Sequence, residues 1–390
     1  MSVTAAKGFV AGGAACGIKE SGAPDLAIVA TEDRTAVPAA GVFTTNRACA
    51  APVQISREHL ADGRAAAVVL SSGNANAATG ERGRTDARRM AALTGEGLGV
   101  TAEHVLVCST GLIGYVLPMD PIESGIPALC ADLNGANAAA DAILTTDTVR
   151  KEAVAEVLGT AGLVGGMAKG AAMLSPAMAT MLAVVTTDVA IDSPTLYESL
   201  LAATSDTFGA LLVDGSMSTN DTVLVLANGR SGVDAIEHNV AFTDALTEVC
   251  GSLAEQMARD AEGAAKLVRL HVTGAASYED ARRAARQVAG SQLVQCSFNG
   301  EDAYWGRVLS ELGASGAEFD PERVRISYGG IVVCHDGVEA RKPTTADALA
   351  AVMAAGEIDL VCDLQAGDAS ARMLFTDLSH AYIDENRRTS

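Results

Sequence analysis

The 390-residue sequence predicts a sandwich of the α/β or α+β class. Helical and strand patterns mix along the chain without the strict β–α–β alternation of a Rossmann sheet or a barrel. Hydrophobic residues make up 49% of the chain and aromatic residues 4%, so we expect a core of Ala, Val and Leu in which helices pack closely on sheets. No fixed-period repeat or low-complexity linker occurs, and the length allows one large domain or two.

Charge and cysteine pattern argue against several classes of protein. The formal net charge of −20 disfavours nucleic acid and anionic membranes as partners, because both are bound through Lys and Arg. The eight Cys form no C-x-x-C pair, and His and acidic residues do not cluster at ligand spacings, so we expect no metal site. There is no apolar span of about 20 residues and no leader-like N-terminus, which predicts a cytoplasmic protein with reduced Cys.

Each predicted strand is a short apolar run that ends in small or polar residues, and each predicted helix repeats apolar residues every three or four positions. The Trp305–Arg307 segment is predicted to be a loop. The strands are predicted at 25–30, 40–45, 65–73, 104–111, 180–188, 223–227, 267–272, 293–298, 323–328, 331–334, 358–363 and 371–375, and the helices at 82–98, 121–144 (with a break near 133–135), 194–208, 240–260, 278–289 and 345–355.

Polar clusters follow several of these strands, where sites commonly lie. Examples are Ser109-Thr110-Gly111 and Ser218–Asp221. The Gly-rich stretch before Lys169 lacks the spacing of a phosphate-binding loop, and no G-x-S-x-G elbow is present. A nucleophile, if there is one, is therefore a Thr, Ser or Cys that is activated in another way.

The central stretch from Lys169 to Asp188 contains one candidate. A Ser175-Pro176 turn leads to Ala179-Thr180 and then to an apolar run. A Thr becomes a nucleophile when its own α-amino group is free, because that amine, with a pKa of about 7.7–8.0, serves as the base. The Thr180 hydroxyl could free the amine by attacking the preceding carbonyl in an N-to-O acyl shift. The residues alone permit this chemistry without selecting it, since a Thr that enters an apolar run is usually an ordinary strand residue.

Motifs along the whole chain resemble, in order, those of the bacterial ornithine acetyltransferases, also called glutamate N-acetyltransferases or the ArgJ family. The resemblance implies a DmpA/ArgJ-like αββα sandwich of the N-terminal-nucleophile type. The matching segments are Ser72–Gly80, Cys108–Gly114, Thr145–Asp147, Lys169–Asp188, Ser218–Thr222, Asp260–Lys266, Trp305–Arg307 and Asp377–Tyr382.

The same resemblance implies an activity. The chain would cut itself between Ala179 and Thr180 into an α chain (1–179) and a β chain (180–390) that stay intertwined in one globular unit. Thr180 would then take acetyl from N2-acetylornithine and pass it to glutamate in a ping-pong reaction of arginine biosynthesis. No cofactor is implied, although some family members accept acetyl-CoA as an alternative donor. Two α and two β chains would form a heterotetramer.

Roles for individual residues also come from the resemblance. Thr110 and Gly111 would form the oxyanion hole through a hydroxyl and a backbone N–H. Lys169 would hold a substrate carboxylate and Glu262 an amino group. Taken singly, Lys169 is typical of a surface lysine and Glu262 of a helix end. The full set of substrate-binding residues is Thr145, Lys169, Thr180, Glu262, Asn386 and Ser390.

The sequence departs from the family pattern at three places. The family has Lys where this chain has Gln295, and Pro-Asn where it has Ala303-Tyr304. The C-terminus is one residue shorter and lacks a Tyr, so Asn386 carries over better than Ser390. These changes are compatible with neutral drift within the family. They are also compatible with a second function, in which the chain is a paralogous Thr-nucleophile acyltransferase or amidohydrolase that acts on another amino-acid derivative in secondary metabolism. A third alternative is an unprocessed, non-enzymatic relative that binds amino acids.

Overall fold

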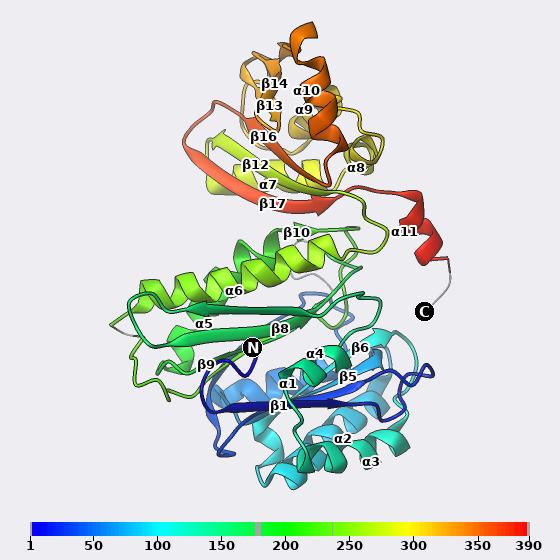
Figure 1. The fold of residues 1–390 in the computed structure, drawn as a ribbon, viewed down its shortest axis with the longest axis vertical. Coiled ribbons are helices and arrows are strands. Elements are labelled where there is room, and N and C mark those ends of the chain that lie inside the picture. The colour runs from blue at the N-terminus through cyan, green and yellow to red at the C-terminus, as the bar shows by residue number, and fades with distance from the viewer. Residues whose placement is uncertain (1, 176–180, 236, 388–390) are drawn as a thin grey trace. The chain divides into compact units, whose positions relative to one another are not determined.

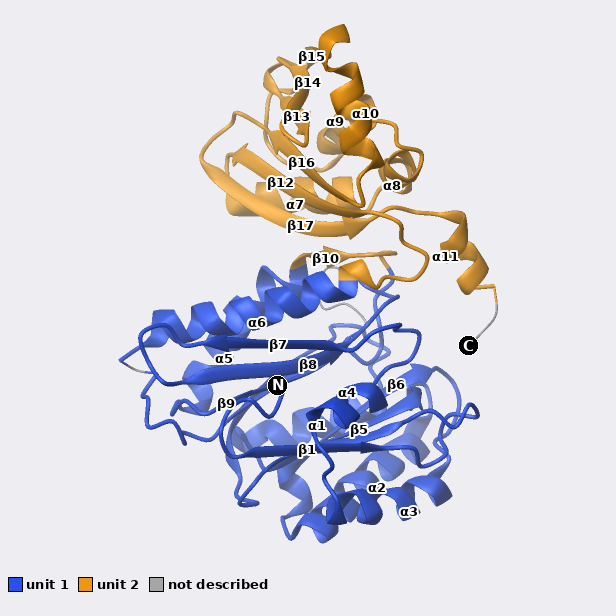
Figure 2. Cartoon of the chain, in the orientation of Figure 1, with its two compact units in different colours: residues 1–209, 216–257 blue, residues 210–215, 258–390 orange. Residues whose placement is uncertain are grey.

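The computed structural model describes residues 2–175, 181–235 and 237–387, and the chain divides into two compact units (Figure 2). Unit 1 comprises residues 1–209 and 216–257, and unit 2 comprises residues 210–215 and 258–390. The predicted cleavage site falls within the bounds of unit 1. The predicted α and β chains therefore do not correspond to the two units, and their separation stays a prediction.

Unit 1 contains two stacked sheets with helices outside both (Figure 1). One sheet has the order β1-β2-β5-β6 and the other the order β4-β3-β11-β9-β8-β7. The strands of the first sheet are β1 (Phe9–Ala14), β2 (Leu26–Thr31), β5 (Ala67–Asn74) and β6 (Val105–Leu112); those of the second are β3 (Val37–Phe43), β4 (Arg64–Ala65), β7 (Lys151–Glu156), β8 (Leu163–Lys169), β9 (Leu182–Thr187) and β11 (Thr222–Ala227).

Alternation along β2 explains the layering of unit 1. Successive strand side chains point to opposite faces. Val29 joins the core between the two sheets, together with Val184 and Leu224 of the second sheet. Its neighbour Ile28 points the other way, into the hydrophobic core that also contains Met90. Because β2 is buried on both faces, it is a continuous apolar run, as the sequence indicates.

Helices complete the four layers. α2 (Gly80–Leu98) and α3 (Met119–Ala131) cover the first sheet (Figure 1). On the second sheet, Gly166 of β8 lies against Val249 and Leu253 of α6. The predicted αββα sandwich is confirmed. The other helices of unit 1 are α1 (Ala51–His59), α4 (Ala136–Ala142) and α5 (Ser193–Ser205), and α6 spans Asn239–Arg259.

Strands β8 and β9 flank the predicted cleavage site. They pair antiparallel, with Lys169 opposite Leu182. β9 also pairs in parallel with β11, where Leu182 is opposite Thr222. Segments from both sides of the predicted cut thus lie side by side in one sheet, and the backbone hydrogen bonds between them do not depend on the peptide bond before Thr180.

Unit 2 is built on a seven-stranded sheet of order β10-β17-β12-β16-β13-β14-β15. Phe298 packs edge-on against Phe375 within its hydrophobic core. The strands are β10 (Leu211–Leu212), β12 (Leu267–Ala275), β13 (Arg325–Tyr328), β14 (Ile331–His335), β15 (Val338–Glu339), β16 (Glu357–Asp363) and β17 (Ala369–Thr376); the helices are α7 (Tyr278–Ala289), α8 (Gln292–Asn299), α9 (Trp305–Ala314), α10 (Ala346–Ala354) and α11 (His380–Glu385).

Two predictions in unit 2 are wrong. The segment 293–298, predicted as a strand, is helix α8, because the Ser291 side chain caps its N-terminus by accepting from the amide of Val294. The Trp305–Arg307 segment, predicted as a loop, is the first turn of α9. Among the described residues, no helix is both long enough and apolar enough to cross a membrane.

Candidate active site

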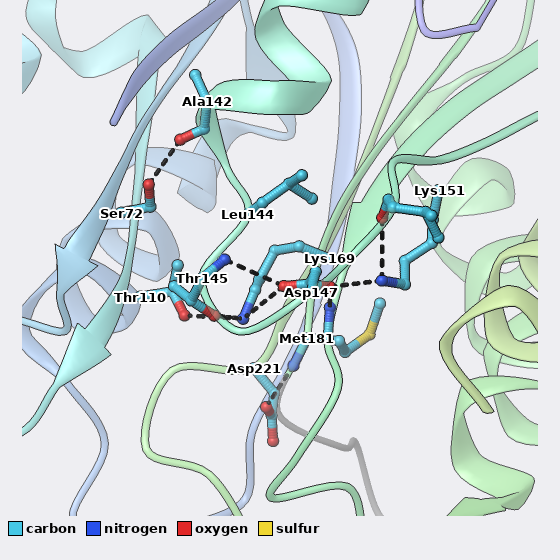
Figure 3. A network of polar contacts seen from close by, with 12 residues as sticks. Ser72, Thr110, Ala142, Leu144, Thr145, Asp147, Lys151, Lys169, Met181 and Asp221 are labelled. Carbon is cyan, nitrogen blue, oxygen red and sulfur yellow. Dashed lines mark hydrogen bonds and ion pairs between the residues drawn. The ribbon is translucent and has the colours of Figure 1, made fainter. Parts of the chain in front are cut away.

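Lys169 is the centre of a buried polar cluster in unit 1 (Figure 3). It is the last residue of β8 and is 3% exposed. Its Nζ donates to Thr145 Oγ1 at 2.6 Å and to Thr110 Oγ1 at 3.5 Å, and lies 3.6 Å from Asp147 Oδ2. A buried ammonium is costly unless it is paired and hydrogen-bonded, and these partners meet that condition.

Asp147 contacts both lysines of this cluster. Its buried carboxylate also accepts from Lys151 Nζ at 2.7 Å and from the amide of Gly170 at 2.6 Å. Burial alone would raise the pKa of Asp147, but Lys169, Lys151 and the Gly170 amide outweigh it and hold that pKa well below its usual range. Asp147 is therefore an anion that fixes Lys169.

Thr110 and Gly111 lie near the end of β6. Because the Thr110 hydroxyl oxygen accepts from Lys169, its own proton is available to donate elsewhere. Gly111 has a φ of +130°, and a Cβ there would lie 2.3 Å from the carbonyl carbon of Gly73 on β5. This position therefore requires glycine, and only glycine allows the backbone conformation that follows Thr110.

The predicted residues of unit 2 form a separate pair. Asn386 donates through Nδ2 to Glu262 Oε2 at 2.8 Å. Tyr382, within α11, donates to Asp214 Oδ2 at 3.2 Å, and Ser379 at the N-cap of that helix donates to the carbonyl of Gly263. These bonds fix the C-terminal helix beside Glu262.

Of the predicted site residues, the structure thus brings Thr110, Thr145 and Lys169 together in unit 1, with Gly111 adjacent, and Glu262 with Asn386 in unit 2. Ala179, Thr180 and Ser390 lie outside the described residues. Asp147 and Lys151 were not predicted as members of the site. Asp147 belongs to the family-like segment Thr145–Asp147, but no sequence pattern marks Lys151 as buried.

Three of the residues that depart from the family pattern lie in unit 2, and the structure shows the surroundings of each. Gln295 is buried, and its Nε2 donates to the carbonyls of Val213 at 3.2 Å and Ala289 at 3.1 Å. Ala303 belongs to the hydrophobic core of the unit, whereas Tyr304 is exposed.

The hydrogen-bond donors around Lys169 are of a kind that suits carbonyl chemistry. In residues 2–175, 181–235 and 237–387, no group of three or more His, Cys, Asp or Glu side chains could hold a metal ion. Hydroxyls and an ammonium instead converge on one place. Such donors stabilise the negative oxygen that forms when a carbonyl is attacked.

Comparison with known proteins decides the family. The model of the ArgJ family matches residues 10–389. The chain belongs to the ArgJ family. The arginine biosynthesis bifunctional protein ArgJ of Streptomyces coelicolor is 47% identical over 389 residues, which cover 99% of each chain. The ArgJ protein of Symbiobacterium thermophilum is also 47% identical, over 98% of this chain and 97% of its own.

A solved ArgJ structure matches part of the chain. The crystal structure of the arginine biosynthesis bifunctional protein argJ from Bacillus halodurans aligns with a TM-score of 0.50 at 36% sequence identity. The alignment covers 97% of that crystal chain but 52% of this one. The crystallised chain is therefore about half as long as this member of the family.

Proposed function

We propose that this ArgJ protein cuts itself before Thr180 and then transfers acetyl from N2-acetylornithine to glutamate through an acetyl-Thr180 ester. Family membership makes it an acyltransferase of arginine biosynthesis. The observation that carries the residue assignment is the Thr110–Thr145–Lys169 cluster. It lies at the end of β8, where the chain leads toward Thr180, and β9 returns from that segment beside β8.

The self-cleavage is an acyl shift followed by hydrolysis. The Thr180 oxygen bonds to the carbonyl carbon of Ala179, the C–N bond breaks, and the hydroxyl proton ends on the freed amine. Water then hydrolyses the ester, which leaves a carboxylate on Ala179 and a free hydroxyl on Thr180. The half-length crystal chain of the Bacillus halodurans relative, beside full-length relatives in sequence, supports this step.

In the transfer reaction the same hydroxyl attacks the acetyl carbonyl of the donor. The free amine of Thr180 takes the hydroxyl proton and gives it to the departing ornithine nitrogen. Glutamate then attacks the acetyl ester through its amine and leaves as N-acetylglutamate. Thr110 and Gly111 stabilise the oxyanion in both halves. Losing one such donor typically lowers the rate by about 10²–10³.

Substrate binding is assigned by charge. Lys169 and Thr145 bind the α-carboxylate that ornithine and glutamate share, since an ammonium in a buried site binds a carboxylate strongly. Glu262, which accepts a hydrogen bond from Asn386, binds a substrate amino group, as the family resemblance implies. Gln295 uses its side chain on two backbone carbonyls, so the departure at this position gives no support to a changed substrate.

Three finer features are also proposals. The α and β chains form a heterotetramer of two α and two β chains, and the enzyme works in the cytoplasm. Acetyl-CoA serves as an alternative acyl donor, and the enzyme uses no resident cofactor. Sedimentation of the processed protein tests the heterotetramer. Formation of N-acetylglutamate from glutamate with acetyl-CoA as the only acyl donor tests the alternative donor.

The test of the proposed function uses intact mass and product formation. Purified protein should yield fragments of residues 1–179 and 180–390 and should form N-acetylglutamate from N-acetylornithine and glutamate. Thr180→Ala should abolish both results. An intact wild-type chain, or an active Thr180→Ala variant, would refute the assignment. Acetyl-Thr180 that forms without any transfer to glutamate would point to a different acceptor.

A further inference from the structure

The loop that precedes β11 connects the two sheets of unit 1 beside the candidate site. Asn220 is buried, and its Nδ2 donates to two backbone carbonyls, Ala75 at 2.6 Å and Ser109 at 2.8 Å. Ala75 follows β5, and Ser109 precedes Thr110 on β6. One side-chain amide of the loop before β11 therefore fixes the strand of the first sheet that carries the predicted oxyanion residues.

The next residue, Asp221, fixes a different segment. It is fully buried, and its Oδ1 accepts from the amide of Met181 at 3.0 Å. That nitrogen is bonded to the carbonyl carbon of residue 180, the predicted nucleophile. The parallel register of β9 and β11 starts one residue later, with Leu182 opposite Thr222. The side-chain bond to Met181 thus continues the ladder toward Thr180.

We propose that Asn220 and Asp221 form a positioning bridge that sets the distance between the chain at Met181 and the oxyanion strand at Ser109–Gly111. The inference rests on the proposed self-cleavage and deepens it. Consecutive residues hold Met181, which follows the predicted nucleophile in sequence, and Ser109, which precedes Thr110, so a shift of either anchor changes the distance between Met181 and Thr110. A misplacement of about 1 Å can lower a rate by about 10²-fold.

The bridge works as a neutral hydrogen-bonding unit. Burial raises the pKa of Asp221 well above its ordinary value, and the Met181 amide, the Ser218 side chain, nearby Lys169 and the Thr44 side chain offset only part of this. Within the described residues, no hydrogen bond to Asp221 Oδ2 meets ordinary limits of distance and angle. An uncharged carboxyl tolerates this environment better than a carboxylate would. An amide of the same shape should therefore replace it.

If Asp221 is neutral, its replacement by Asn and its replacement by Ala should have different effects on the rate of self-cleavage. Asp221→Asn keeps an oxygen to accept from the Met181 amide and keeps the side chain neutral, whereas Asp221→Ala removes the acceptor. A matched control is Asp188, which follows the other end of β9 and accepts from the amides of Leu163 at 2.8 Å and Lys7 at 3.1 Å. Asp188→Ala removes a comparable buried carboxyl far along the strand.

The experiment measures the first-order rate of self-cleavage in freshly translated full-length chains, with the thermal midpoint and the hydrogen exchange of the Met181 amide. We expect Asp221→Asn to cleave within about threefold of wild type. Asp221→Ala should cleave at least about tenfold more slowly and lose protection at Met181, since poor positioning costs rate. Asp188→Ala should lower the midpoint but leave the rate unchanged.

Three outcomes would overturn the bridge: a folded Asp221→Ala that cleaves at the wild-type rate, a folded Asp221→Asn that does not cleave, or an Asp188→Ala that slows cleavage as much as Asp221→Ala. If wild type itself stays intact, the proposed self-cleavage is wrong. In that case the exchange of the Met181 amide still decides whether Asp221 holds it, because full protection in Asp221→Ala contradicts the bridge.

Discussion

Replacing Thr110 by Val tests the oxyanion assignment with little change in shape. The side chain is buried, and its hydroxyl accepts one hydrogen bond, from Lys169 at 3.5 Å, which is at the limit of such bonds. Lys169 keeps its partners Thr145 and Asp147 in the variant. A typical hydrogen bond contributes about 0.5–1.5 kcal/mol net, so we expect the free energy of unfolding to fall by less than about 1 kcal/mol.

The rate should respond far more strongly than the stability. Loss of one oxyanion donor costs about 10²–10³ in rate, or about 2.7–4 kcal/mol of barrier. Because Thr110 would serve both the acyl shift and acetyl transfer, Thr110→Val should slow both reactions. Cleavage is followed by the appearance of the 180–390 fragment under denaturing conditions, transfer by N-acetylglutamate formed per processed chain, and stability by urea unfolding.

Ser109, the neighbour of Thr110, serves as the control: Ser109→Ala should lower the stability and leave the rates of cleavage and transfer unchanged. Ser109 Oγ is paired with Ser71 Oγ at 2.8 Å in a buried position. Ser109→Ala leaves the Ser71 hydroxyl unpaired, which costs about 1–3 kcal/mol, but removes nothing assigned to catalysis. A Thr110→Val variant that cleaves and transfers within a fewfold of wild type would refute the oxyanion role of the Thr110 hydroxyl.

Three further perturbations test other parts of the site. Lys169→Met breaks a buried ion pair with Asp147 and should cost about 3–5 kcal/mol in urea unfolding, while any remaining activity shows a raised KM for both substrates. The folded-state pKa of Asp147 is lowered, so its contribution to stability is complete above its unfolded pKa of about 4 and is lost as the pH falls below that value. In Asp147→Asn, the free energy of unfolding should therefore depend less on pH below about pH 4. An unchanged pH dependence would contradict the charged state assigned to Asp147. Gln295→Lys, which restores the family residue, should leave the preference for N-acetylornithine over other acyl donors unchanged, as kcat/KM for each donor will show.

The sequence predicts the sheets of unit 1 well where a strand is buried on both faces. β2, β5 and β6 are continuous apolar runs, and the helix that became α2 has clear spacing. β8 was missed because its Gly165-Gly166 pair is typical of a turn. In the fold these glycines admit close neighbours: a Cβ at Gly165 would lie 2.2 Å from the carbonyl oxygen of Ser2. Tertiary contact of this kind leaves no local signal.

The sequence predicts only those site residues that belong to family-like motifs. Thr110, Thr145 and Lys169 come from three distant segments, and the family resemblance united them before the structure placed them within hydrogen-bonding distance. Lys151 heads a short strand with charged residues and looks solvent-exposed in sequence, yet its ammonium is buried against Asp147. Local patterns describe the faces of a strand but cannot show which distant carboxylate neutralises a lysine.

The proposed mechanism can be tested by the mass of the purified protein after a brief incubation with N-acetylornithine. We expect two fragments, residues 1–179 and 180–390, with one acetyl group on Thr180 of the second fragment that disappears when glutamate is added. A single intact chain, or an acetyl group on any other residue, would contradict self-cleavage before Thr180 and acetyl transfer through it.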